Sequence, residues 1–287
     1  MSIERPQEYY ATQSSVTDPV AFAYLYDALP HTPADLSHIV QGLILHYVAE
    51  RHLYNYPPER TTEIDTRYAS AILRRLLELD NSPLDQTRSP EQRFIGCCRD
   101  FTLLAVSILR HFGIAARARH GFANYLIPGV YMDHVVVEYW DGTAWILWDS
   151  EMPARLDINV FDLPRDRFVV GGLAWQMARS GQVQPELFCI IPDLPINGFP
   201  FIQSRLMQDL AALNKTEMLC WDEWYNEDDP VAIDLLAEVT QHGDAGFTRW
   251  RQLFMAGSPF ALPRYFSSFS PAHPDADLPI RLSLDSD

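Results

Sequence analysis

The stretch that decides the fold is residues 93–151, RFIGCCRDFTLLAVSILRHFGIAARARHGFANYLIPGVYMDHVVVEYWDGTAWILWDSE. Its pattern predicts a loop, a buried helix that opens on a cysteine, a strand, a gap and a two-stranded hairpin. Cys98 stands at the predicted helix start, His134 opens one hairpin strand, and Asp149 closes the other. A thiol, an imidazole and a carboxylate are the groups of a nucleophile, its base and the group that orients the base.

The predicted helix begins at Cys98 and ends before Gly113, which can supply a left-handed cap. Its apolar residues follow helical spacing and surround most of the helix, so we expect it to be buried. Gly96, just before the cysteines, allows the backbone to turn tightly. A cysteine in a first helical turn faces unpaired backbone amides, a setting that favours the reactive thiolate. Cys97 is expected to be structural or supporting.

The hairpin turn decides whether His134 and Asp149 can meet. If Asp141-Gly142 forms a two-residue turn, His134 and Asp149 are direct cross-strand neighbours. A four-residue loop, 141–144, leaves them on the same face as diagonal neighbours, whereas a three-residue loop puts them on opposite faces. Two other histidines, His111 and His120, are alternatives to His134 as the base. His111 lies about 20 Å from Cys98 along the predicted helix and is excluded, but His120 is not.

The same residues carry a family resemblance. GCCRDFTLLAVSILRHFGIAAR, DHVVVEYW and WILWD resemble the transglutaminase-like core, whose Cys-His-Asp triad lies on a papain-like fold. The family's cysteine is followed by an Asp two residues later, which selects Cys98 over Cys97. The resemblance implies an α+β fold in which a central helix packs on an antiparallel sheet, flanked by N- and C-terminal helices. Further stretches look like uncharacterised bacterial transglutaminase-like proteins, which supply no substrate.

Composition excludes several classes of protein. The formal net charge of −16 repels nucleic acid and anionic membranes, so neither is an expected partner. The four cysteines show no disulfide framework and no common zinc spacing, and no metal or cofactor is expected. With no secretion signal or apolar run of membrane-spanning length, we expect a cytoplasmic protein. The oligomeric state is left open.

Outside the central stretch the sequence predicts mostly helices. We expect a single domain over residues 1–270, with a catalytic core at about 64–155 and a mobile tail over 271–287. An irregular arm over 1–17 precedes the predicted helices, which span about 18–29, 32–52, 64–79, 173–179, 204–214, 230–240 and 247–256.

The predicted activity is acyl transfer from a carboxamide or peptide carbonyl through a thioester on Cys98, with His134 and Asp149 completing the site. The expected partners are a peptide, protein or small amide substrate and an amine co-substrate. Gln92, six residues before Cys98 as in papain-type enzymes, is a candidate oxyanion donor, and Tyr125 and Trp148 are candidate pocket walls. The alternatives are a cysteine hydrolase (peptidase, amidase or deamidase) with the same triad and a catalytically silent binding module.

Overall fold

The structure is a computed structural model that describes residues 5–154, 157–225, 229–241, 243–274 and 280–282. The chain divides into two compact units, residues 1–118 with 136–163, and residues 119–135 with 164–287. Each unit is described by itself. Within the described residues no helix has the length and apolar character needed to cross a membrane.

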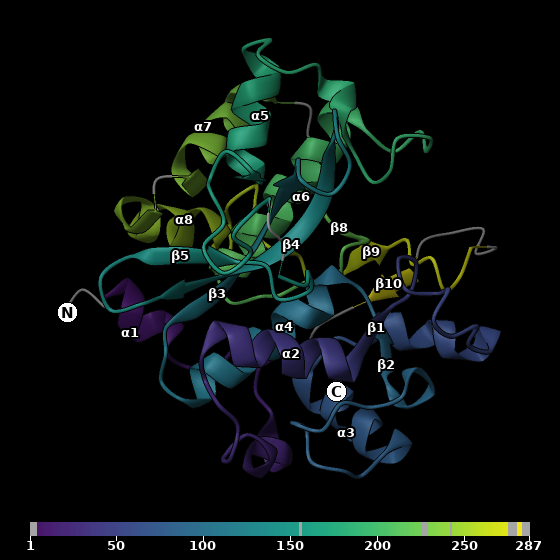
Figure 1. Ribbon diagram of the computed structural model, residues 1–287. Coiled ribbons are helices and arrows are strands. Elements are labelled where there is room, and N and C mark those ends of the chain that lie inside the picture. The colour runs from purple at the N-terminus through teal and green to yellow at the C-terminus, as the bar shows by residue number, and fades with distance from the viewer. Residues whose placement is uncertain (1–4, 155–156, 226–228, 242, 275–279, 283–287) are drawn as a thin grey trace. The chain divides into compact units, whose positions relative to one another are not determined.

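The helices and strands are shown in Figure 1. The α-helices are α1 (Pro6–Tyr10), α2 (Pro33–Leu43), α3 (Ala69–Leu79), α4 (Cys98–His111), α5 (Gly171–Arg179), α6 (Gly198–Leu213), α7 (Pro230–Gln241) and α8 (Phe247–Phe254). The strands are β1 (Ile44–His46), β2 (Phe94–Gly96), β3 (Ala116–Ala123), β4 (Tyr131–Trp140), β5 (Trp145–Trp148), β6 (Phe168–Val170), β7 (Phe188–Cys189), β8 (Asp222–Glu223), β9 (Phe266–Ser268) and β10 (Ile280–Leu282). Short 3₁₀ helices span Val20–Leu25, Pro58–Asp65, Pro90–Gln92, Pro185–Leu187 and Gly243–Gly246.

The first unit is built around α4, which lies next to α2 and α3 (Figure 1). Leu104, Ile108 and Leu109 of α4 belong to one buried apolar cluster with side chains of α2, α3, β4 and β5. The predicted cap is confirmed, because Gly113 has φ +72° and donates its N–H to Arg110 O. The helix that begins at Cys98 is therefore a buried core element.

The helix predicted over 32–52 ends early. α2 stops at Leu43, and residues 44–46 form β1, which pairs in parallel with β2, so that His46 lies beside Gly96. The apolar run around Ile44 suits a helix or a strand, and the partner strand just before Cys98 decides in favour of the strand. The predicted arm also contains a short helix, α1, and the helix predicted from residue 18 is the 3₁₀ helix Val20–Leu25.

The main sheet has the strand order β5-β4-β3-β6, with β7 paired to β4. β4 pairs with β5 and β3 with β6 in antiparallel fashion, but β4 and β7 are parallel. The expected antiparallel sheet is thus correct for the hairpin and incomplete for the sheet as a whole. β3 and β4 each cross the boundary between the two units, since residues 118 and 135 fall inside these strands.

The hairpin loop has four residues. Trp140 pairs with Trp145 and Val137 with Trp148, so the loop is 141–144. Asp141 Oδ1 accepts the N–H groups of Thr143 and Ala144 at 2.7 and 2.8 Å, which organises the loop, and Gly142 has φ +105°. The two-residue turn is therefore wrong, and the four-residue alternative is observed.

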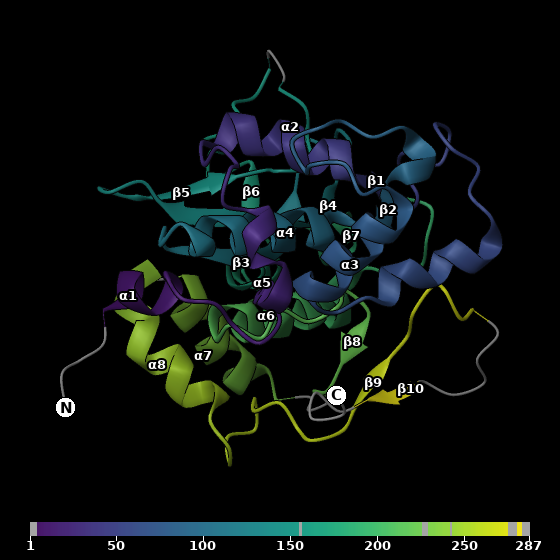
Figure 2. The same cartoon turned by 90° about the horizontal axis from the view of Figure 1, so that it is seen from below.

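The second unit is mainly helical. α5 packs against α6 and α7 through two glycines: a Cβ on Gly171 would lie 2.7 Å from Leu206 Cα, and one on Gly172 would lie 2.6 Å from Ala237 O. α7 and α8 lie side by side (Figure 2), and β8, β9 and β10 form a small antiparallel sheet. The four helices predicted downstream of the hairpin are confirmed, with shifted ends.

These elements confirm the predicted α+β class. The single domain over 1–270 and the mobile tail over 271–287 stay predictions. Residues 275–279 and 283–287 of that tail lie outside the described residues, and residues 280–282 form β10.

Candidate functional site

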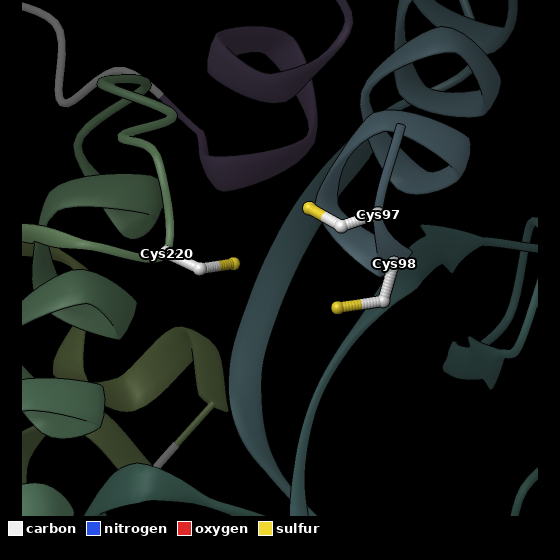
Figure 3. A group of neighbouring side chains, drawn as sticks. All are labelled: Cys97, Cys98 and Cys220. Carbon is white, nitrogen blue, oxygen red and sulfur yellow. The ribbon is translucent and has the colours of Figure 1, made fainter. Parts of the chain in front are cut away.

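Cys98 is the first residue of α4 and is 9% exposed. Cys97 precedes the helix in extended conformation, and its N–H donates to Asp100 Oδ2 at 2.9 Å. Figure 3 shows the side chains of Cys97 and Cys98 leaving this first turn, and it also labels Cys220, which follows α6 in the second unit. Cys98 thus occupies the position where a thiol lies closest to the free N–H groups of a helix.

The backbone just before Cys98 is held in place by close packing. A Cβ on Gly96 would lie 2.9 Å from Asp100 Oδ2 and 3.0 Å from Ile44 Cγ2, so only glycine fits there without displacing its neighbours. Asp100 in turn pairs with Arg99 at 3.0 Å, and Arg99 donates to Thr66 O and Arg67 O. These contacts hold the start of α4 in one conformation.

Asp149 lies directly after β5 and is fully buried. Its N–H donates to Val160 O at 2.8 Å. Its Oδ1 accepts the N–H groups of Glu151 and Met152 at 3.0 and 3.1 Å. The carboxylate therefore closes a tight turn at the end of the strand with one of its oxygens.

His134 belongs to the second unit, on the part of β4 before the boundary, and is 4% exposed. The ring of Tyr125 packs edge-on against the imidazole, with ring centroids 6.4 Å apart. Tyr125, proposed from the sequence as a pocket wall, therefore contacts the proposed base.

Next to His134, Asp133 forms an ion pair with Arg205 Nη1 at 3.1 Å. Burial raises the pKa of Asp133 to about 6, although the nearby Arg205 cation opposes this shift. Burial also raises the pKa of the Cys189 thiol, and the charge of Asp133 adds to the effect. Near His134, burial thus raises the pKa of the Asp133 carboxyl, and it raises the pKa of the Cys189 thiol as well.

The other residues singled out from the sequence lie in ordinary structural surroundings. Gln92 accepts the Ser89 hydroxyl at 2.8 Å in the 3₁₀ turn before β2. Trp148 is fully buried in the core of the first unit and donates its Nε1–H to Ser37 Oγ at 2.8 Å. His111 ends α4 and pairs with Asp27, at the opposite end of the helix from Cys98, whereas His120 is buried in β3.

Sequence reasoning missed two side chains at Cys98. A carboxylate oxygen of Glu151 lies within 4.8 Å of Cys98 Sγ. His46 Nε2 lies 3.9 Å from Glu151 Oε1. The proximity of Glu151 could have been read from its position two residues after Asp149, but His46 is 52 positions from Cys98 and carried no local signal. The thiol and the carboxylate both belong to the ligand types that bind zinc.

The second unit has a cavity of about 670 Å³ within residues 175–233. Its walls include the aromatic side chains Trp175, Phe199 and Trp224 and the carboxylate of Glu223. Its volume is in the range of small-molecule sites.

Comparisons with known proteins give a family match and a structural neighbour. Residues 59–150 match the sequence model of the transglutaminase-like superfamily, a segment that contains Cys98, His134 and Asp149. A solved structure of a "Putative Cysteine Protease" from Cytophaga hutchinsonii is similar at 14% identity and a TM-score of 0.36, over 59% of this chain and 47% of that one. This chain thus covers about half the length of that protein. A search of curated proteins finds no significant match. The family match supports a cysteine-dependent enzyme in general. The match covers residues 59–150, about a third of the chain, and this segment is similar to the transglutaminase-like superfamily.

Proposed function

We propose that the chain is a cysteine-dependent acyltransferase in which Cys98 is the nucleophile, His134 the base and Asp149 the group that orients the base. The observation that carries this proposal is the place of Cys98, the first residue of a buried helix inside the segment that matches the superfamily. A thiol there meets the positive end of the helix dipole. This favours the thiolate over the thiol.

The hairpin register supports His134 and Asp149 as a pair. Val137 pairs with Trp148, so the next position of the ladder would set Val136 opposite Asp149. Side chains alternate along a strand, and His134 is therefore on the same face of β4 as Val136. This is the diagonal arrangement expected for a four-residue loop, and such neighbours are within reach of long side chains.

In the proposed reaction His134 removes the Cys98 proton, and the thiolate attacks a carboxamide or peptide carbonyl. The C–S bond forms, the C–N bond breaks, and ammonia or an amine leaves with a proton from the imidazolium. In this proposal the Cys98 backbone N–H stabilises the developing oxyanion, and Gln92 is the candidate for a second donor. A second amine or water then opens the thioester.

Transfer is proposed ahead of hydrolysis because the matching family is transglutaminase-like. Its substrates would be a peptide, protein or small amide as donor and an amine as acceptor. A cysteine hydrolase using the same residues is the second candidate, favoured by the carboxylate of Glu151 within 4.8 Å of Cys98 Sγ, a group that can deprotonate water.

Iodoacetamide labelling tests the nucleophile. We expect Cys98 to be the fastest cysteine to react and to do so well below pH 8.5, the ordinary pKa of a thiol. Cys98→Ala should abolish this fast phase, and Cys97→Ala should retain it. Fast labelling that survives Cys98→Ala in a folded protein would refute the assignment.

Mass spectrometry of products then identifies the reaction. A library of peptide amides is incubated with the protein in the presence and absence of a small primary amine. Amine-dependent mass gain indicates transfer, and loss of ammonia or peptide cleavage without the amine indicates hydrolysis. A library that remains unchanged while Cys98 still reacts quickly would favour the binding module.

A further inference from the structure

A second imidazole–carboxylate pair, His46 and Glu151, adjoins Cys98 in the first unit. Glu151 Oε1 lies 3.9 Å from His46 Nε2, and a Glu151 carboxylate oxygen lies within 4.8 Å of Cys98 Sγ. Both side chains are largely buried, with 16% and 14% of their surface exposed. Both residues lie outside the segment matched by the superfamily, 59–150.

The orientation of His46 is fixed by the backbone around it. In the β1–β2 ladder His46 pairs with Gly96, two residues before Cys98. Its Nδ1 accepts the N–H groups of Val48 and Ala49 at 3.2 and 3.1 Å. The neutral ring must then carry its proton on Nε2, the nitrogen nearest Glu151.

Glu151 is held as firmly. Its N–H donates to Asp149 Oδ1 at 3.0 Å. Gln41 Nε2 donates to the carbonyl oxygens of Ser150 and Met152, the residues on either side, at 3.3 and 3.2 Å. A turn fixed at three consecutive residues gives the carboxylate a defined position beside the thiol.

We infer that Glu151, positioned by His46, is the proton acceptor for the water or amine that opens the thioester on Cys98. This inference rests on the proposed function. As the water or amine attacks the thioester carbon, the new C–O or C–N bond forms, its proton passes to the Glu151 carboxylate, and the C–S bond breaks to release the Cys98 thiolate. Transfer of the proton from Glu151 to the thiolate restores the resting state, so no further reactant is needed.

The same carboxylate has an electrostatic effect of opposite sign on the first half of the reaction. A negative charge this close to a sulfur disfavours the thiolate. Removing the charge should therefore ease formation of the thiolate while slowing the opening of the thioester. Damage to the fold would slow both steps. The other titratable groups of the first unit at this turn and at the start of α4 are His46, Cys97, Arg99, Asp100 and Asp149.

The test compares wild type with Glu151→Gln. p-Nitrophenyl acetate serves as the acyl donor, because nitrophenol release reports acylation and the later steady state reports hydrolysis of the acyl-enzyme. For Glu151→Gln we expect hydrolysis to slow by about 10²-fold. We also expect the pH midpoint of iodoacetamide labelling at Cys98 to fall by about one unit. His46→Gln, which removes only the positioning group, should slow hydrolysis less.

Glu50→Gln is the matched control, because Glu50 is a second carboxylate bonded to the same histidine, and it accepts the backbone N–H of His46 at 2.8 Å. It should leave both readouts unchanged. Wild-type hydrolysis and an unchanged labelling midpoint in folded Glu151→Gln would overturn the inference while leaving Cys98 as nucleophile. Absence of an acyl-enzyme in wild type would instead refute the proposed function. If Glu151→Gln does not fold, Glu151→Asp replaces it, and hydrolysis at the wild-type rate would overturn the inference.

Discussion

The two units hold their reactive groups in different ways. In the first unit, Cys98 and Asp149 lie in local hydrogen-bonded turns, the Cys97–Asp100 hydrogen bond and the turn from Asp149 to Met152, which distant residues such as Gln41 then brace. In the second unit, Asp133, next to His134, pairs with Arg205, which is 72 positions away. Local order can be read from a sequence, whereas the electrostatic surroundings of His134 depend on tertiary contacts.

The largest effect is expected on the acylation rate when the His134 imidazole is removed. His134→Ala should slow p-nitrophenyl acetate acylation by about 10²–10⁴-fold, since that is the usual contribution of a general base. His120→Ala is the comparison variant, because His120 is also buried in the main sheet. Circular dichroism confirms that both variants fold. A normal acylation rate in His134→Ala together with a slow one in His120→Ala would identify His120 as the base.

Asp149→Asn tests the carboxylate that the first unit supplies. The amide keeps a hydrogen-bond acceptor for the turn. It loses the negative charge that the proposed mechanism uses to stabilise the imidazolium. In serine-protease triads the equivalent change costs about 10⁴ in rate. A thiol needs less help than a hydroxyl, so we expect a loss of roughly 10–10³ in turnover. A rate within a factor of two of wild type would remove Asp149 from the site.

The smallest effects are expected on the free energy of unfolding, first at Asp133, the residue next to His134. The pKa of Asp133 is raised from 3.8 to about 6, so between these pH values the folded state keeps a proton that the unfolded state has lost. Stability should therefore fall as pH rises from about 4 to 6, by roughly 2–3 kcal/mol for this group. In Asp133→Asn that fall should be absent. Urea unfolding of both proteins across this range measures it.

Asp141, in the first unit, should affect the pH dependence of stability in the opposite direction, and Asp141→Asn tests this. Hydrogen bonds from Ala144 and Thr143 hold the pKa of Asp141 below its usual value, so its contribution is present above that value and is lost on acidification. The variant should lose stability at neutral pH and less at low pH.

An Asp133→Asn protein whose stability declines like that of wild type between pH 4 and 6 would contradict the expected contribution of Asp133.

The sequence by itself predicted the elements with strong local signals. The helix at Cys98 follows from apolar spacing and from Gly113, and the hairpin follows from two β-rich runs around Asp141-Gly142. Both signals lie within one helix or one turn, where neighbouring residues decide the conformation. The match of residues 59–150 to the transglutaminase-like model could be predicted from motifs that are themselves local.

Tertiary structure decided what those signals leave open. Ile44 forms a strand instead of extending α2 because β2 lies beside it, and that pairing brings His46 next to Gly96. The loop has four residues because the side chain of Asp141 accepts the hydrogen bonds that organise it. Glu151 approaches Cys98 because the turn after β5 is held by Gln41, 110 positions away. The strand at Ile44 and the position of Glu151 each depend on a contact whose other partner the local pattern does not contain, so sequence periodicity cannot supply them. The loop length depends on side-chain hydrogen bonds within the loop, which apolar periodicity does not encode.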